Sequence, residues 1–487
     1  MMRALFSGVS GLKVHQTKMD VIGNNISNVN TVGFKSSSVN FSDVFYQTTQ
    51  SATGPNPTTG AAGRNAMQIG LGANIASVTQ SIATSGAAQR TDNPFDLMIK
   101  GDAFFVVNSG GTNYFTKAGS FGVDGYGTLC TPSGASVMGW QVDKDNPDKI
   151  IRDTVSKLQI MGPDNLYSKP EATKAGYVTG NIDKLDDQLT DPEGSIVNIS
   201  FYDKTGQSYT ADLSIKATAD EGKYTVEATD IIDYNGDSIF VTKNDSGEYV
   251  ASEIEEFTFA GITYKVGNIN SVTGEFTLTA TPNENPIITF DSATGEFVSV
   301  ASSQETGTDL DSPNSIKFKV NSSVADGANV FEEIDLDFSS LTQYGTNGAS
   351  SITANKGSLK GEDTGRTFGN MTGISVDGSG KIYGKYDNGD SKLLGQIAVA
   401  TFSNPSGLEA VGNNMFAATQ NSGEFDGIGQ DPTQGGGEIT PGVLEMSNVD
   451  LSAQFTDMIT TQRGFQANSR IITTSDTLLE ELINLKR

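Results

Sequence analysis

The residue types that most often do chemistry are scarce in this chain. Catalytic triads and most metal sites use histidine, and the 487 residues include one, His15. It stands between Leu12 and Met19 in a run of apolar residues spaced three and four apart. In such a setting histidine is far more often a packing residue than a ligand or a general base. We therefore interpret His15 as a helix-contact residue.

The thiol chemistry of the chain depends on a single residue, Cys130, so no internal disulfide can form. The local sequence is Leu129-Cys130-Thr131-Pro132, with no histidine nearby to activate the thiol. We interpret Cys130 as a small apolar core residue and expect the stability of the fold to come from packing alone.

Two loops look like ligand sites only in part. Residues 143–148 are acidic like a calcium loop, but Asp148 stands where glycine is required and Thr154 where a bidentate glutamate is required. Residues 377–381 are glycine-rich but lack the GxxxxGK[ST] spacing of a phosphate loop, so a hairpin turn is expected. We therefore expect no catalytic residue, metal site or cofactor, and the chain is not predicted to be an enzyme.

The charge distribution restricts the partners. The chain has 58 acidic and 32 basic residues, a formal charge of −26 and a pI near 4.3. Such a surface repels nucleic acid and anionic lipid, so we expect neither nucleic acid nor membrane as a partner. The ends differ from the middle, because residues 1–35 carry a net charge of +3 and residues 451–487 are neutral. Nearly neutral ends can pack against further copies of themselves while an acidic middle stays solvated.

Targeting signals are also missing from the sequence. No run of 18 apolar residues could span a membrane, and the start Met1–Gly8 lacks the apolar stretch of a secretory signal. Taken alone, this pattern would indicate a cytoplasmic protein.

The sequence predicts a helix at each end of the chain, and the N-terminal one carries His15. A heptad spacing runs through about 25 residues near the N-terminus, about 37 Å of helix, and residues 24–33 end it with Asn and Gly. A second run follows Pro441, where Gly464 alone interrupts residues 443–487, and predicts a helix of about 35 residues. Ser447 or Asn448 could cap this helix, with Asp450 near its first turn.

Both helix seams are impure, so we predict that the two ends order fully when they pair with each other and with neighbouring copies. The predicted assembly residues of these seams are Leu5, Leu12, Met19, Ile22, Ile26, Val29, Leu451, Phe455, Met458, Phe465, Ile472, Leu479 and Ile483.

The segments between the helices read as β-structure. Short strands separated by Asp-Gly, Asn-Gly and Ser-Gly pairs favour hairpins, among them Ile196–Tyr202, Glu255–Val266, Ile316–Val320 and Ile397–Phe402. The predicted fold is multidomain and mainly β, with terminal helices paired as a coiled coil and nested, discontinuous β-domains between them. The expected domains are a helical assembly domain (1–35 and 440–487), an extended connector (36–90), a middle β-domain (91–145 and 366–435) and an inserted outer β-region (146–365) that could hold one domain or two.

Each end of the chain carries a sequence motif. The first runs through Ser7–Leu12 and Asp20–Lys35, and its partner runs through Gly442–Leu451 and Gln462–Arg470 to the final Leu485-Lys486-Arg487. The main motif residues are Asn24, Asn25, Asn28, Thr31, Gly33, Phe34, Ser447, Asn448, Val449, Asp450, Gln462, Arg463 and Asn468. With these residues, the two motifs resemble the flagellar rod and hook axial protein family.

The large insertion at 146–365 makes the chain similar to hook proteins rather than to shorter rod proteins. The resemblance implies a structural subunit that polymerises with itself into a flexible, curved tube and transmits torque from rod to filament. It implies rod, hook-cap and hook–filament junction proteins as partners, export by a type III apparatus without a cleaved signal peptide, and an extracellular location in the hook.

Three other interpretations stay open from the sequence. A distal rod or hook-associated axial protein would share the assembly helices, and curved against straight polymers would distinguish it. A surface adhesin would need a signal peptide, and a hydrolase would need histidine outside the N-terminal seam.

Overall fold

The computed structural model describes residues 2–55, 60, 62–143, 146–147, 149–254, 256–282, 285–301, 314–321, 330–434 and 437–485. The chain forms two compact units. We call residues 1–166, 372–385 and 391–487 the helix-bearing unit, and residues 167–371 and 386–390 the sandwich unit. Both ends of the chain belong to the first unit, so the second is inserted into it.

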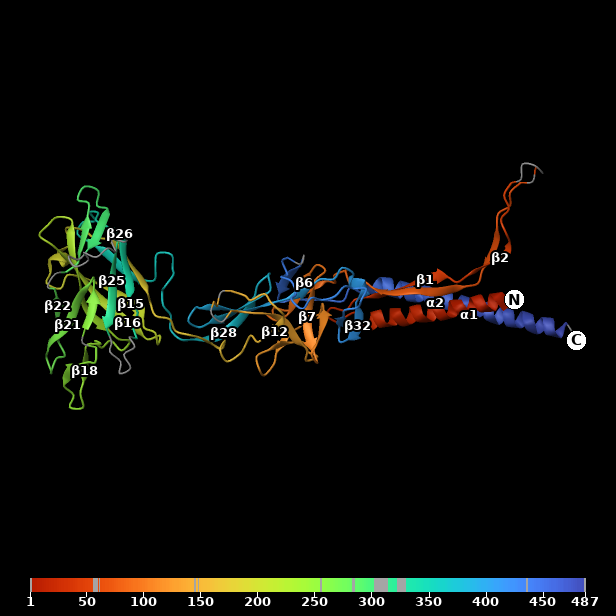
Figure 1. Ribbon diagram of the computed structural model, residues 1–487, viewed down its shortest axis with the longest axis horizontal. Coiled ribbons are helices and arrows are strands. Elements are labelled where there is room, and N and C mark those ends of the chain that lie inside the picture. The colour runs from red at the N-terminus through yellow and green to blue at the C-terminus, as the bar shows by residue number, and fades with distance from the viewer. Residues whose placement is uncertain are drawn as a thin grey trace. The chain divides into compact units, whose positions relative to one another are not determined.

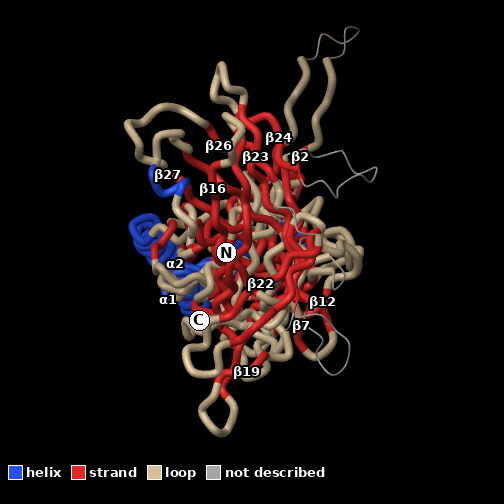
Figure 2. The backbone as a smooth tube through the Cα atoms, turned by 90° about the vertical axis from the view of Figure 1, so that its left-hand side faces the viewer, coloured by secondary structure: helices blue, strands red, loops and turns tan. Residues whose placement is uncertain are grey.

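The helix-bearing unit contains the two long helices, α1 (Met2–Ser27) and α2 (Leu451–Asn484). They lie side by side in Figures 1 and 2, and their contacts confirm the predicted pairing of the terminal helices. The carboxylate of Asp450 caps α2 by accepting hydrogen bonds from the backbone N–H groups of Ser452 and Ala453.

Two boundaries of the predicted helices are wrong. Ser447 and Asn448 do not cap α2, because residues 443–445 form a strand and residues 446–450 stay outside the helix. α1 ends at Ser27, so Val29 lies in the turn that follows. Asparagine side chains compete there for backbone groups, since Asn28 donates from Nδ2 to the carbonyl of Asn24 over 3.0 Å.

The strands of the helix-bearing unit are short and come from both halves of the chain. They are β1 (Ser37–Asp43), β2 (Tyr46–Gln50), β3 (Met67–Gly70), β4 (Ala73–Gln80), β5 (Ala88–Arg90), β6 (Leu97–Lys100), β7 (Phe104–Ser109), β8 (Thr112–Thr116), β9 (Gly122–Val123), β10 (Leu129–Cys130), β11 (Ser136–Gln141), β12 (Ser156–Lys157), β29 (Lys381–Tyr386), β30 (Ser391–Ile397), β31 (Val399–Ala400), β32 (Glu409–Gly412), β33 (Met415–Ala417), β34 (Glu438–Pro441) and β35 (Val443–Glu445). β28 (Gly369–Val376) starts in the sandwich unit and ends in this one.

The main sheet of this unit joins distant parts of the sequence. β29, β30, β11, β7, β8, β33 and β32 lie side by side in that order. Phe104, Phe105, Val106 and Val107 of β7 are all fully buried, as expected for a strand covered on both faces. β34 pairs with β6 and β35 pairs with β5, so the segment leading into α2 lies beside residues 88–100.

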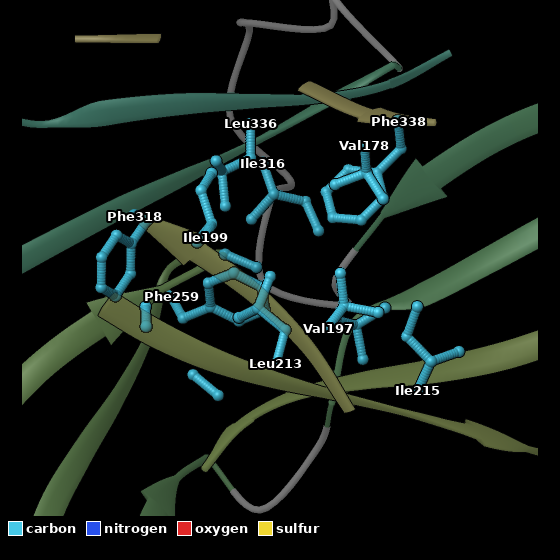
Figure 3. Close-up of a cluster of buried hydrophobic side chains, with 14 of the residues drawn as sticks. Val178, Val197, Ile199, Leu213, Ile215, Phe259, Ile316, Phe318, Leu336 and Phe338 are labelled. Carbon is cyan, nitrogen blue, oxygen red and sulfur yellow. The ribbon is translucent and has the colours of Figure 1, made fainter. Parts of the chain in front are cut away.

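Among its described residues, the sandwich unit consists of strands and loops with one short 3₁₀ turn. Its larger sheets have the orders β22-β21-β20-β25-β26-β14-β27 and β15-β16-β17-β23-β24, and β18 pairs with β19 separately. Figure 3 shows apolar side chains of both sheets meeting in one core, among them Val178, Leu213 and Phe318. Its elements are β13 (Tyr167–Ser168), β14 (Ala175–Asn181), η1 (Asp187–Thr190), β15 (Ser195–Tyr202), β16 (Ser208–Ala217), β17 (Lys223–Ile232), β18 (Val241–Lys243), β19 (Tyr249–Ala251), β20 (Glu256–Phe259), β21 (Ile262–Ile269), β22 (Phe276–Thr281), β23 (Ile287–Phe290), β24 (Phe297–Ala301), β25 (Ser315–Asn321), β26 (Ile334–Thr342) and β27 (Ser351–Lys356).

Two of the predicted strands differ from the observed ones. Of the predicted strand Glu255–Val266, the described residues 256–266 form the hairpin β20–β21, because Ala260 and Gly261 take positive φ angles of 52° and 75° and turn the chain back. Residues 397–402 hold only the end of β30 and the two-residue β31. The predicted strand Ile397–Phe402 therefore lies mostly beyond the end of β30 instead of forming one continuous strand.

Candidate assembly interface

The two terminal helices run antiparallel in a fixed register. Gly8 of α1 faces Ile472 of α2, and Gly11 faces Asn468, so partner numbers fall along α2 as they rise along α1. Further along, Asn25 Nδ2 donates to Gln454 Oε1 over 3.1 Å. The two helices are therefore in contact over most of the length of α1.

The glycines set the distance between the helices. A methyl group built on Gly11 would lie 2.7 Å from Asn468 Nδ2, and one built on Gly464 would lie 2.7 Å from the ring of His15. A contact below 3 Å requires the neighbour to shift. Side chains of one helix thus fill the spaces that glycine leaves on the other.

The face of α2 that meets α1 is formed largely by small and polar residues. Thr461 and Ser475 are its most buried residues, and Gly464 and Asn468 lie between them. On α1 the most buried apolar side chains are Val14 and Ile22. The sequence pattern missed Val14, Thr461 and Ser475. The glycines at positions 8, 11 and 464 were the signal that could have indicated a close helix contact.

The predicted seam residues fall into two groups. The first group is at least partly covered. In it Ile22 is buried, and the half-buried residues are Leu5, Leu12, Met19, Ile26, Val29, Met458, Ile472 and Leu479. The second group is exposed in the single chain and consists of Leu451, Phe455, Phe465 and Ile483. The helix pair therefore brings together only part of the predicted α2 seam.

Large apolar side chains remain on the outside of the helix pair. We define the outward apolar face as the exposed residues Phe6, Val9, Phe455, Ile459, Phe465, Ile471, Leu478, Leu482 and Ile483. Phe6 is 68% exposed and Ile459 58%. The C-terminal end of α2 also continues past the start of α1 (Figure 1). One copy of the chain leaves these groups in water.

Several motif residues tie α1 to the strands that follow. Asn25 is buried, accepts a hydrogen bond at Oδ1 from Ser37 N (2.9 Å) and donates from Nδ2 to Ser37 O (2.8 Å). Thr31 Oγ1 donates to Asn28 Oδ1 over 3.1 Å. Gly33 has a φ of +70° and leaves no space for a Cβ, which would lie 2.7 Å from Ala118 N.

The C-terminal motif residues have similar roles. Asn448 accepts from Ser36 N over 2.8 Å and donates to Ser81 O over 2.9 Å. Ser447 Oγ accepts from Val449 N, and Asn468 fills the space beside Gly11. Phe34 is half-buried, and its backbone N–H donates to Thr31 O over 3.2 Å, whereas Gln462 and Arg463 are exposed. The final Lys486 and Arg487 lie outside the described residues.

A buried ion pair joins the two motifs. Lys35 Nζ lies 2.8 Å from Glu445 Oε1, and the two side chains are 1% and 0% exposed. Lys35 also donates to Thr84 O, and Glu445 Oε1 accepts from Gly86 N. Sequence reasoning missed this pair, because residues 410 positions apart carry no local signal of contact.

A second buried lysine lies near this pair. Lys117 donates to the carbonyl of Gly101, and its Nζ lies 5.0 Å from the ring centre of Phe104. The pKa of Lys117 is lowered to about 8, mainly by burial; the charge of Glu445 opposes this shift and the charge of Lys35 adds to it. The buried charged residues Lys35, Glu445 and Lys117 thus lie near one another in the helix-bearing unit. We call the place where the segment after α1 meets the segment before α2 the helix junction.

Other chemistry has little support among the described residues. No group of three or more His, Cys, Asp or Glu side chains there is arranged to hold a metal ion. Within the same part of the chain, no helix is long and apolar enough to cross a membrane. Cys130 is half-buried, and burial raises the pKa of its thiol. The acidic loop 143–148 lies partly outside the described residues.

Comparisons with known proteins agree with the motifs at both ends. The family model for flagella basal body rod proteins matches residues 5–35, and the model for the C-terminal part of flagellar basal body rod proteins matches residues 440–485. The model for the D1 domain of flagellar hook proteins matches residues 98–179.

Similar proteins extend over the whole chain. The flagellar hook protein FlgE of Treponema pallidum is 34% identical over 506 residues, and that of Borreliella burgdorferi is 35% identical over 495, each covering 100% of both chains. The Salmonella typhimurium protein is 29% identical and covers 98% of both chains. A solved flagellar hook protein from Helicobacter pylori is 13% identical with a TM-score of 0.35, covering 74% of this chain and 100% of that chain. The full-length identity shows that this chain belongs to the flagellar hook protein family.

Proposed function

We propose that this chain is the structural subunit of a bacterial flagellar hook and that it polymerises through its outward apolar face. The observation that carries the proposal is the exposure of large apolar side chains along both helices. The α1–α2 contact itself is made at glycines, so it does not cover these side chains. Covering one such side chain contributes about 1.5–3 kcal/mol. Several of them on each copy are enough to drive association with further copies.

The nesting of the chain suggests how the polymer is layered. The paired ends (1–35 and 440–487) would line an inner channel, the β-domain formed by 91–145 and 366–435 would form a middle layer, and the inserted region 146–365 would face outward. Residues 36–90 would connect the inner and middle layers. Modest, polar contacts between outer parts can slide, which a bent and rotating tube requires. Such a tube would transmit torque from rod to filament.

The proposed partners follow from this role. Further copies of the chain, the rod, the hook cap and the hook–filament junction proteins would contact it, and a type III apparatus would export it without cleaving a signal peptide. Its location would be extracellular, in the hook. No catalytic step, cofactor, nucleic acid or membrane enters the proposal.

Removing residues 451–487 tests the proposal. The shortened chain should stay monomeric. It should also remain β-rich by circular dichroism, because the larger sheets of the sandwich unit and the main sheet of the helix-bearing unit lie outside α2. Electron microscopy after salting-out should show curved tubes for the full chain and none for the shortened one. Tubes formed by the shortened chain would contradict the proposal, and straight tubes from the full chain would favour a distal rod protein.

A further inference from the structure

We infer that His15 makes the helix pair sensitive to protons: protonation of its imidazole separates α1 from α2 and thereby weakens the polymer. This inference rests on the proposed function, because it concerns the same helices. His15 is the only histidine of the chain.

The imidazole of His15 lies inside the helix contact. A methyl group built on Gly464 would lie 2.7 Å from both Cε1 and Nε2, so the ring packs directly on the backbone of α2. On another side the ring meets Phe41 of β1 edge to face, with 6.1 Å between ring centres. The ring cannot turn away from α2 without losing one of these contacts.

One ring nitrogen is unsatisfied in this position. Nδ1 is shielded from solvent and has no hydrogen-bond partner among the described residues. Thr461, one turn before Gly464 on α2, is 2% exposed, and its Oγ1 is also without a partner in the described part of the chain. A neutral imidazole can leave one nitrogen without a proton, whereas an imidazolium carries N–H on both and must bury an unpaired donor.

The charges around the ring also oppose protonation. Lys18 lies one turn further along α1, and its Nζ is paired with Asp457 Oδ1 of α2 over 3.4 Å. Burial, and then the charge of Lys18, lower the pKa of His15 below 6.5. Burial no longer acts once the helices separate, whereas Lys18 stays on the same helix as His15.

The charged residues next to the contact residues Gly464 and Phe41, and Lys13 beside His15, are exposed. Lys13 on α1 and Arg463 on α2 are both exposed and carry the same sign as an imidazolium. Asp43 at the end of β1 is exposed and raises the pKa of its neighbour Tyr46 through a hydrogen bond. β4, which also contacts α1, has no charged residue.

The direction of the pH effect follows from these pKa values. The paired state holds His15 at a pKa below the 6.5 of the separated state, so pairing is at full strength above pH 6.5. It weakens as the pH falls through 6.5 towards the lower value of the paired state. The equilibrium constant can fall by up to tenfold per pH unit within that window, because one proton is bound for each pair that opens.

The test compares the full chain with its His15→Gln variant, whose side chain is neutral at every pH. Polymers of both are equilibrated at pH 7.5, 6.5 and 5.5, and the concentration of subunit left after pelleting is measured. We expect this concentration to rise severalfold more between pH 6.5 and 5.5 for the wild type than for the variant. The many carboxylates titrate alike in both, so the difference isolates His15.

Equal pH dependence in the two proteins, or no dependence in the wild type, would overturn the inference. If neither protein forms tubes at pH 7.5, the proposed function fails instead. A second measurement does not need the variant: ¹³C-labelled histidine gives one imidazole signal in the wild-type polymer. Its titration midpoint should lie below 6.5, and a midpoint at or above 6.5 would equally overturn the inference.

Discussion

At the scale of single residues, the most unusual feature is the charge buried beneath the helix junction. Lys35 and Glu445 are removed from water and compensated by each other and by backbone groups of the loop at 84–86. Removing one member of such a pair leaves an uncompensated buried charge, which typically costs about 3–5 kcal/mol. This pair therefore fixes the position of the N-terminal segment against the segment leading into α2.

Glu445→Gln should lower the free energy of unfolding of the helix-bearing unit by about 3 kcal/mol or more, because Lys35 keeps its charge without an anion. Urea denaturation at pH 7 measures this loss. The double variant Lys35→Met with Glu445→Leu is the control and should be close to the wild type, since it buries no charge. A loss below 1 kcal/mol in the single variant would show that Lys35 finds another partner.

Lys117 gives a prediction that depends on pH. Its pKa of about 8 lies below the value of 10.5 expected in the unfolded chain, so below pH 8 the charged form destabilises the fold by about 3 kcal/mol. That penalty disappears as the pH rises from 8 to 10.5. Lys117→Met should thus be more stable than the wild type at pH 7, and the gap should narrow by pH 10. Denaturant titrations at both pH values measure it, and a constant gap would contradict the account.

At the scale of elements, the heptad spacing was enough to predict both helices but not their inner faces. Phe455 and Phe465 follow the same spacing as Met458 and Ile472, yet the first two are exposed and the second two are half-buried against α1. An apolar period shows that a face is to be covered, and it does not say by which chain. Small residues such as Gly464 make the contact between the helices of one chain instead, and a search for apolar periodicity does not detect them.

Gly464→Ala should lower the Tm of the polymer, because the added methyl group meets the His15 ring at 2.7 Å. Gly23→Ala is the matched control on α1: a methyl group there has no neighbour within 4 Å, and alanine favours a helix by up to about 1 kcal/mol over glycine. Calorimetry should therefore show opposite shifts for the two variants. A stabilised Gly464→Ala polymer would mean that the helices are further apart than this register requires.

At the scale of the whole molecule, the sequence predicted a nested chain, but the compact units divide it at different residues. The sandwich unit starts at Tyr167, whereas the insertion was expected to start at residue 146. β12 pairs with β11, and Arg152 Nη2 lies 2.6 Å from Asp431 Oδ2, so these residues are fixed to the helix-bearing unit. A two-residue strand and one long-range ion pair leave no periodic signal in a sequence.

Deleting residues 167–371 should leave a protein that still polymerises. Tyr167 and Asn370 are paired across β13 and β28, so the cut ends are adjacent and a short glycine–serine linker can join them. Electron microscopy should show tubes whose curvature differs from that of the wild type. The larger deletion 146–365 removes β12 and is the contrasting variant, expected to unfold more easily. Loss of assembly in the smaller deletion would contradict the layering proposed here.

The central claim is that the outward apolar face joins one copy of the chain to the next. The most direct measurement is pelleting and electron microscopy of the double variant Phe455→Gln with Ile459→Gln, whose parent side chains are 50% and 58% exposed. The account predicts that the variant keeps the α1–α2 pair, since neither side chain lies in the glycine contacts, and forms no tubes at wild-type concentrations. Tubes formed as readily as by the wild type would contradict it.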